Sequence, residues 1–89
     1  MLIHSLALDR SIWDSVVDRL SGAGLAEVLT FDCRGHGRSD RVAGPYTAEG
    51  FARDVHELMA HVGWTDATIA GCSMGGCVTL AFAAAYPQQ

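Results

Sequence analysis

The sequence predicts an α/β fold, a partial, doubly wound parallel sheet made from alternating strands and helices. Three short apolar runs each precede a stretch with helical spacing, which gives the order β-α-β-α-β-α. Strands that alternate with helices form parallel sheets with right-handed crossovers. A Gly-x-Ser-x-Gly sequence, Gly71 to Gly75, separates the third strand from the third helix. It therefore lies at the carboxyl edge of the sheet, where folds of this class bind their ligands.

Length and composition fit one globular domain. The 89 residues are 49% apolar and 18% charged, with a net charge of −4. The basic residues are scattered arginines, so no nucleic acid partner is expected, and no apolar run is long enough to span a membrane. The cysteines, Cys33, Cys72 and Cys77, are an odd number in a chain without a signal peptide. This favours reduced thiols and a cytoplasmic location.

The first strand is predicted over Met1 to Ile3, and a loop from His4 to Leu8 follows it. A helix is predicted to begin at Ser11, whose side chain can cap it while Asp14 returns the bond, as in a capping box. Apolar residues at helical spacing then share one face, and two glycines end the helix. This apolar face consists of Ile12, Trp13, Val16, Val17 and Leu20.

The second strand is predicted over Glu27 to Asp32, where a mostly apolar run suits a strand covered on both faces. A glycine-punctuated loop follows from Cys33 to Asp40 and continues to a turn at Gly44-Pro45. Arginines crowd this loop and alternate with acidic residues. The pattern indicates a salt-bridged loop rather than a phosphate site, and the residues concerned are Asp32, Arg34, Arg38, Asp40 and Arg41.

A second helix is predicted over Ala48 to Val62, with Thr47 as its N-cap and Gly63 as its stop. An apolar stripe at spacings of three and four gives this helix one buried face. The third strand is predicted over Ala67 to Ala70, and a third, apolar helix over Met74 to Tyr86. The stripe of the second helix consists of Phe51, Val55, Leu58, Met59 and Val62.

The turn around Ser73 has the residues of a nucleophile elbow. Such a turn is strained, and Gly71 and Gly75 flank the serine because side chains there would collide with the crossing backbone. The following helix directs free N–H groups toward the serine oxygen, where they stabilise negative charge. Gly76 is expected to let this helix approach the strands closely. Glycines around a serine also occur in ordinary βα turns, but the strand before and the helix after favour a catalytic Ser73.

Three motifs, in this order and spacing, resemble the α/β-hydrolase fold family of serine hydrolases. His4-Ser5-Leu6 stands where the family has His-Gly-x after its third strand, and the loop from Asp32 to Ser39 matches the loop after the fourth. Gly71 to Gly76 matches the elbow after the fifth strand. The resemblance implies that residues 1–89 form a single incomplete domain, with strands three to five of the family fold and the helix after the elbow.

The same resemblance implies roles for individual residues. By position, Ser73 is the nucleophile, and the backbone N–H groups of Leu6 and Met74 form the oxyanion hole. Asp32 and its loop support the site. Ser5 stands where the family usually has glycine. With this serine, the Ser-Met-Gly-Gly elbow and a tryptophan in the first helix, the sequence resembles the 3-oxoadipate enol-lactonase and esterase branch of the family.

The acid and the histidine of the family's triad follow the nucleophile, yet Met74 to Gln89 contains no Asp, Glu or His. The resemblance therefore implies an N-terminal fragment, about a third of a usual hydrolase, that needs a missing C-terminal segment or a partner chain. We expect the 89-residue chain alone to be nearly inert. Because its third strand has an open edge, we also expect self-association.

Other residues are weaker candidates for catalysis. His4 is the best upstream substitute for the missing base, but the favoured interpretation is a structural histidine beneath the oxyanion loop. His36 is expected to be an exposed loop residue, and Cys72 a small buried one. His56 and His61 lie in the second helix, at a distance from the strand ends.

For the intact protein, the first hypothesis is a serine hydrolase that cleaves carboxylic esters or lactones through a Ser73 acyl-enzyme. Its partner is then a small-molecule substrate, and the chemistry requires neither a metal nor an organic cofactor. Within the same fold, the alternative is a carbon–carbon bond hydrolase or a haloperoxidase-like enzyme. A non-catalytic remnant or binding module is the hypothesis from another class. A segment that supplies an acid and a histidine would discriminate between these classes.

Overall fold

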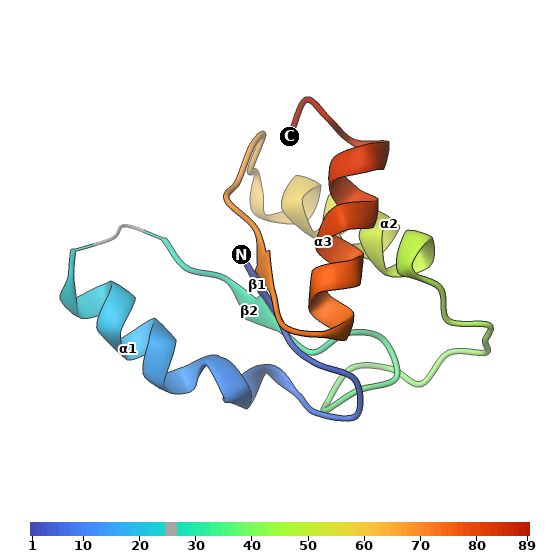
Figure 1. Cartoon of the computed structure of the whole chain (residues 1–89), viewed down its shortest axis with the longest axis horizontal. Coiled ribbons are helices and arrows are strands. Elements are labelled where there is room, and N and C mark those ends of the chain that lie inside the picture. The colour runs from blue at the N-terminus through green and yellow to red at the C-terminus, as the bar shows by residue number, and fades with distance from the viewer. Residues whose placement is uncertain (25–26) are drawn as a thin grey trace.

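The computed structural model describes residues 1–24 and 27–89 and contains the predicted parallel sheet. Three strands, β1 (Leu2–Ile3), β2 (Thr30–Phe31) and β3 (Ala70–Gly71), lie in the order β2-β1-β3. Both neighbours pair with β1 in parallel, so the first strand of the chain is the centre of the sheet (Figure 1). The alternation of strands and helices is confirmed.

The strands are shorter than the sequence patterns predicted. β2 occupies two residues of the expected Glu27 to Asp32, and β3 shares only Ala70 with the expected Ala67 to Ala70. The residues beside β1 also bond to the chain before β3. The Met1 carbonyl accepts a hydrogen bond from the Ala70 N–H at 3.0 Å, and the Met1 ammonium donates to the Thr68 carbonyl at 2.8 Å. Met1 therefore continues the contact between β1 and the chain before β3 beyond the two residues of each strand.

The first helical segment begins differently from the prediction. A 3₁₀ turn, η1 (Arg10–Trp13), leads into α1 (Asp14–Gly22). Asp9, not Ser11, is the cap, since its carboxylate accepts the Ser11 N–H at 2.9 Å. The predicted capping box is therefore wrong, because a carboxylate two residues earlier already satisfies the free donor. α1 lies apart from α2 and α3 across the sheet and has no fully buried residue (Figure 1).

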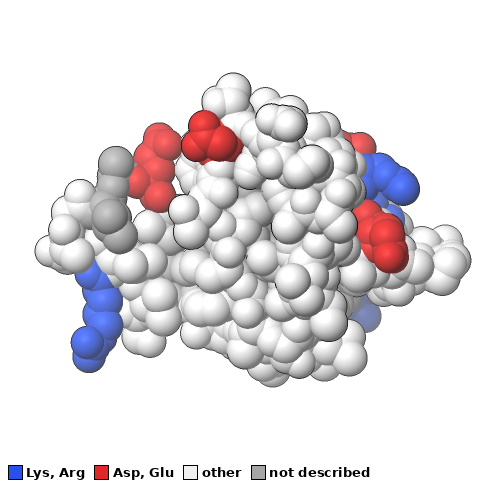
Figure 2. All heavy atoms as spheres, turned by 45° about the horizontal axis from the view of Figure 1, so that its top comes forward, with Lys and Arg blue, Asp and Glu red and all other residues white. Residues whose placement is uncertain are grey.

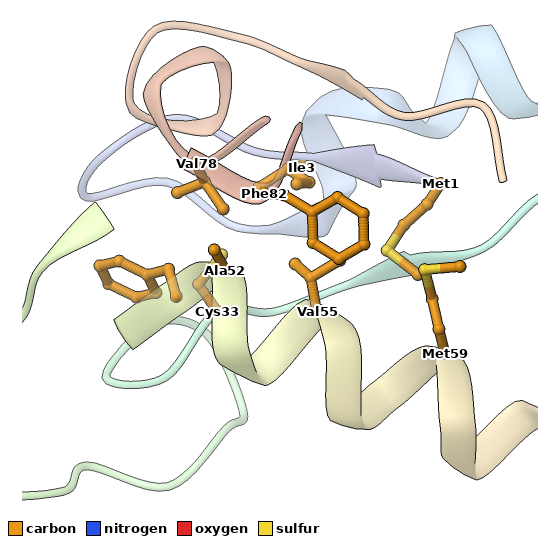
Figure 3. Packing of buried hydrophobic residues seen from close by; sticks show 9 residues of the cluster. Met1, Ile3, Cys33, Ala52, Val55, Met59, Val78 and Phe82 are labelled. Atoms are coloured by element: carbon orange, nitrogen blue, oxygen red, sulfur yellow. The ribbon is translucent and has the colours of Figure 1, made fainter. Parts of the chain in front are cut away.

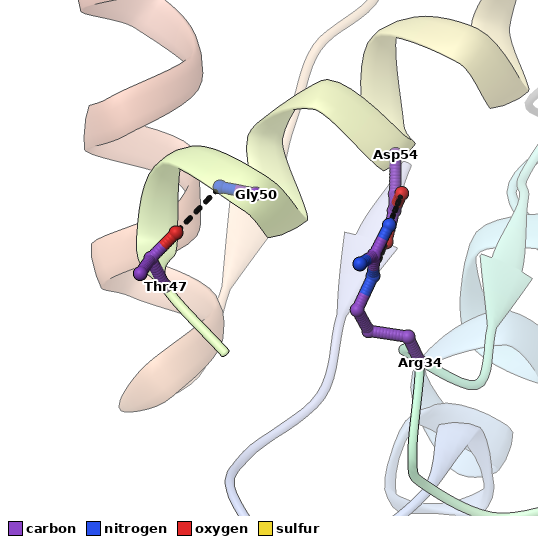
Figure 4. Close-up of polar contacts among 4 residues, drawn as sticks. All are labelled: Arg34, Thr47, Gly50 and Asp54. Atoms are coloured by element: carbon purple, nitrogen blue, oxygen red, sulfur yellow. Dashed lines mark hydrogen bonds and ion pairs between the residues drawn. The ribbon is translucent and has the colours of Figure 1, made fainter. Parts of the chain in front are cut away.

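The second and third helices match their predictions closely. α2 (Ala48–Val62) has the predicted bounds, and the Thr47 hydroxyl accepts the Gly50 N–H at 3.0 Å at its start (Figure 4). Gly63 ends it in the left-handed conformation, with φ of 80°. α3 (Met74–Ala85) ends one residue before the prediction. None of the helices in the described part of the chain has the length and apolar character needed to cross a membrane.

The core lies between the sheet and the layer formed by α2 and α3. Side chains from β1, both helices and the loop after β2 converge there (Figure 3). Removing these apolar surfaces from water is the main favourable contribution to folding. The buried cluster consists of Met1, Ile3, Cys33, Phe51, Ala52, Val55, Met59, Val78 and Phe82.

An ion pair ties the loop after β2 to α2. The guanidinium of Arg34 binds both carboxylate oxygens of Asp54 (Figure 4). The sequence pattern instead suggested pairing within the loop, with Asp32 and Asp40. A bidentate pair fixes geometry as well as charge, but partial exposure keeps its energy modest. On the face shown in Figure 2, the charged side chains lie toward the margins around an uncharged centre.

The core predicts unequal effects for two helix substitutions. The Met59 side chain is fully buried, whereas Leu80 on α3 is 74% exposed. We expect Met59→Ala to lower the free energy of unfolding by about 2–5 kcal/mol, because it leaves a cavity. Leu80→Ala is the control and should cost less than about 1 kcal/mol. Urea denaturation measures both, and equal losses would show that this core does not hold the chain together.

Candidate active site

The turn between β3 and α3 holds Ser73 in a strained conformation. Ser73 has φ of 55° and ψ of −110°, a region that residues with side chains rarely adopt. Its side chain is exposed and makes no capping hydrogen bond to α3. The predicted strand, tight turn and helix are thus present, and the serine stands at the tip of the turn.

The two glycines that flank the serine are required because other backbone atoms pass too close to leave room for a side chain. A Cβ atom on Gly71 would overlap the Gly75 carbonyl, and one on Gly75 would overlap the carbonyl of Ile3 in β1. This agrees with the reason that the sequence suggested for both. Gly76 differs, because a Cβ there would meet the Gly71 carbonyl oxygen at 3.7 Å, an ordinary contact. The expectation that Gly76 permits close packing is therefore wrong.

The two predicted oxyanion donors come from separate segments. Met74 follows Ser73 as the first residue of α3, and Leu6 lies in the loop after β1. Within residues 1–24 and 27–89, neither backbone N–H donates a hydrogen bond to the protein. Both segments are brought together by β1 and β3, where Ile3 is in register with Gly71. The fold therefore brings to the same edge of the sheet two segments that each carry an available donor.

His4 is buried beneath this loop, and backbone groups occupy both of its ring nitrogens. Nδ1 lies 2.7 Å from the Ser5 carbonyl, and Nε2 accepts the Cys33 N–H at 2.9 Å. These contacts fix the tautomer with the proton on Nδ1. Because no ring nitrogen is left to take a proton from Ser73, the structure agrees with a structural histidine.

The second loop histidine lies differently from the prediction. His36 is only 9% exposed, and its ring centroid lies 5.0 Å from that of His4. Gly35 and Gly37 flank it with φ of 74° and 51°, so the loop turns back and directs the ring inward. Nδ1 of His36 lies 3.0 Å from the Arg34 carbonyl. The expectation of an exposed residue is therefore wrong.

Asp32 holds the loops together through backbone donors. Its carboxylate accepts the Arg10 N–H at 2.8 Å and the Arg38 N–H at 3.0 Å. The hydrogen bond from Arg38 is the main cause that lowers the pKa of the Asp32 carboxyl, and the Arg10 N–H adds to it. Asp32 therefore joins η1 to the loop after β2. This agrees with the structural role that the sequence suggested for it.

The three cysteines are unpaired and differ in environment. Cys33 belongs to the core, and burial raises the pKa of its thiol to about 11. Cys72 and Cys77 are exposed beside the elbow, so the expectation of a buried Cys72 is wrong. Cys72 follows β3, which is an edge strand of the described sheet.

A hollow of about 770 Å³ lies at the opposite end of the strands from Ser73. It is lined by residues such as Met1, Trp64 and Ala67, and by none of the three predicted site residues. Ligands in parallel α/β sheets bind beyond the carboxyl ends of the strands, and this hollow lies away from that edge. Ser73 instead stands exposed at the surface of the described chain.

Comparison with known proteins gives consistent matches. A family model described as the alpha/beta hydrolase fold matches residues 1–89. An esterase from Thermogutta terrifontis superposes with a TM-score of 0.91 at 35% identity, over 98% of this chain and 32% of that one. An enol-lactonase from Burkholderia xenovorans LB400 superposes with a TM-score of 0.83 at 37% identity, over 98% and 33%. A non-heme haloperoxidase from Rhodococcus erythropolis is 36% identical over 76 residues, which are 85% of this chain and 27% of the relative.

The chain is much shorter than these proteins. It spans about a quarter of the length of the first curated relatives that it matches, and about a third of the solved structures. The matched part contains β1 to β3 and the elbow, so the similarity covers the segment that carries Ser73.

The environment of Asp32 predicts a pH dependence of stability. The folded chain lowers the pKa of this carboxyl, so its contribution to stability is complete above the ordinary pKa of aspartate. That contribution is lost as the pH falls through the lower, folded value. We expect the unfolding free energy of the wild type to drop more steeply than that of Asp32→Asn as the pH falls from about pH 5 to about pH 2. Parallel urea titrations test this, and identical slopes would contradict the assigned hydrogen bonds.

Proposed function

Because the chain belongs to the alpha/beta hydrolase fold family, as the match over residues 1–89 shows, we propose that it is the nucleophile-bearing part of a serine hydrolase. The substrates proposed are carboxylic esters or lactones. The observation that carries the proposal is the strained Ser73 at the tip of a strand–helix turn, followed directly by the first N–H groups of α3. The names of the similar esterase and enol-lactonase support this substrate class.

The proposed chemistry proceeds through an acyl-enzyme. A histidine takes the proton from the Ser73 hydroxyl, and the serine oxygen attacks the carbonyl carbon of the substrate. The resulting oxyanion accepts hydrogen bonds from the N–H groups of Leu6 and Met74. The alcohol leaves with a proton from the histidine, and water then releases the acid. In this scheme, residues 1–89 supply the nucleophile and hold the two N–H donors in place.

The base must come from polypeptide outside residues 1–89. Residues 74–89 contain no acid or histidine, and backbone groups already occupy both ring nitrogens of His4. A serine site without its base retains only about 10³–10⁴-fold acceleration over water, from binding and the oxyanion hole. We therefore propose that the isolated chain is nearly inactive and that another segment or a partner chain completes the site.

A haloperoxidase-like activity is the second candidate. It is favoured by the 36% identity to the haloperoxidase of Rhodococcus erythropolis. The elbow alone does not separate this activity from ester hydrolysis, because the walls that select a substrate are not part of residues 1–89. Assays for both activities on a completed protein would separate them.

A chimaera tests the role of Ser73. Residues 1–89 would replace the matching third of the Thermogutta terrifontis esterase, which then supplies the remaining fold. We expect hydrolysis of a 4-nitrophenyl ester, lowered at least about 10³-fold by Ser73→Ala because the nucleophile is lost. Intact mass after treatment with a fluorophosphonate should show one adduct, which Ser73→Ala removes.

The control is Ser15→Ala, an exposed serine on α1, which should leave both activity and labelling unchanged. Activity that survives Ser73→Ala in a folded chimaera would contradict the proposed nucleophile. Rapid, Ser73-dependent labelling of the 89-residue chain by itself would instead contradict the proposal that its base lies elsewhere.

The sheet predicts self-association of the isolated chain. Among the described residues, β3 pairs only with β1, so its outer edge offers free backbone groups to another strand. The apolar helix α3 also leaves Leu80 74% exposed. We expect sedimentation velocity to give an apparent mass of at least twice the 9.5 kDa chain. A single monomeric species at about 100 μM would contradict this prediction.

A further inference from the structure

A side-chain contact joins the two segments that carry the proposed oxyanion donors. The Ser5 hydroxyl donates a hydrogen bond to the Cys72 carbonyl, at 3.3 Å, across 67 positions of sequence. Ser5 directly precedes Leu6 in the loop after β1, and Cys72 directly precedes Ser73. Each end of this bond is therefore one residue away from a proposed site residue.

On the loop side, the direction of the Leu6 N–H is already fixed. The Ser5 carbonyl lies 2.7 Å from Nδ1 of His4 and accepts the Leu8 N–H at 3.3 Å. The Ser5–Leu6 peptide is trans, so its N–H points away from its carbonyl. These bonds set the orientation of the Leu6 N–H but not its distance from the elbow, because both are made within the β1 side of the site.

On the elbow side, Cys72 is held by backbone bonds. Its N–H donates to the Ile3 carbonyl at 3.1 Å, and its carbonyl accepts the Gly75 N–H at 2.9 Å. The carbonyl that receives the Ser5 hydroxyl is therefore anchored in the turn that places Ser73 and Met74. A bond to this carbonyl relates the loop directly to the nucleophile.

We propose that Ser5 is a positioning residue, whose bond to Cys72 sets the separation between the N–H groups of Leu6 and Met74. This rests on the proposed function, which assigns those two groups to the oxyanion. The glycine that is usual at this position in the family has no hydroxyl to make the bond. The bond from Ser5 to Cys72 therefore requires the serine that this chain has in place of the usual glycine.

The expected effect is moderate. At 3.3 Å the bond is longer than the usual 2.7–2.8 Å of a hydroxyl donor, so it contributes like a weak neutral hydrogen bond. Removing the hydroxyl should weaken binding of a tetrahedral ligand about fivefold. It should also increase the motion of the loop, because one restraint of the Ser5–Leu6 peptide is lost.

Phenylboronic acid is a suitable probe with the ¹⁵N-labelled chimaera of residues 1–89 and the Thermogutta terrifontis esterase, because the esterase part completes the site. The Ser73 oxygen donates a lone pair to boron, its proton passes to solvent, and the boron becomes tetrahedral with an oxygen in the oxyanion position. Boron NMR gives the dissociation constant, and the amide shifts of Leu6 and Met74 report contact with that oxygen. ¹⁵N relaxation of the chimaera without boronate gives the order parameter of Leu6, which is near 0.85 for a rigid backbone and below about 0.6 for a flexible one.

We expect Ser5→Ala to weaken the boronate about fivefold, to reduce the Leu6 shift and to lower the Leu6 order parameter. Ser5→Thr keeps the hydroxyl and should restore all three. Ser15→Ala, an exposed serine-to-alanine change on α1, is the matched control and should alter none of them. Ser5→Gly is a second variant without the hydroxyl, should the alanine variant fold poorly.

Boronate binding by Ser5→Ala that equals the wild type, at equal thermal stability, would overturn the proposal. A wild-type chimaera that forms no adduct would count against the proposed function instead. In that case the order parameter of Leu6, which needs no adduct, tests the role of Ser5. A fall in Ser5→Ala that Ser5→Thr restores supports this role, and an unchanged value overturns it.

Discussion

The close approach of three backbone segments at the elbow is the constraint on which the rest of the structure depends. Neither Gly71 nor Gly75 has room for a Cβ atom, because the carbonyls of Gly75 and Ile3 occupy that space. α3 can therefore begin against the central strand, and Ser73 is forced into a conformation with positive φ. Such strain persists only where the surrounding packing imposes it. Here α3 is fixed by its packing on α2 through the buried core.

Side-chain hydrogen bonds of His4 and Asp32 help to hold the loops around the elbow. His4 joins the loop after β1 to the backbone of Cys33. Asp32 joins η1, through the Arg10 N–H, to the Arg38 N–H in the loop after β2. Because each polar atom is paired, these groups add order without the cost of an unsatisfied donor. The resulting frame is rigid on the β1 side and open beyond β3, where a serine hydrolase would need its remaining groups.

Local signals explain why some elements could be predicted with their bounds. Thr47 and Gly63 delimit α2 as expected, because a cap and a left-handed glycine act within a few residues of the helix ends. The start of the first helix was wrong because Asp9 and Ser11 are both good caps, and local sequence does not rank them. The strand lengths were wrong because pairing depends on the short central strand, which the flanking runs do not reveal.

The sequence by itself determined the order of elements, the place of the elbow and the need for glycine on both sides of Ser73. These features follow from short-range sterics and from the period of apolar residues, which any chain segment carries within itself. The tertiary structure alone decided that His36 is buried, that Arg34 pairs with Asp54 and that the Ser5 hydroxyl reaches Cys72. Each of these contacts joins residues from different elements, and their partners are set by how the helices and strands pack rather than by neighbouring sequence.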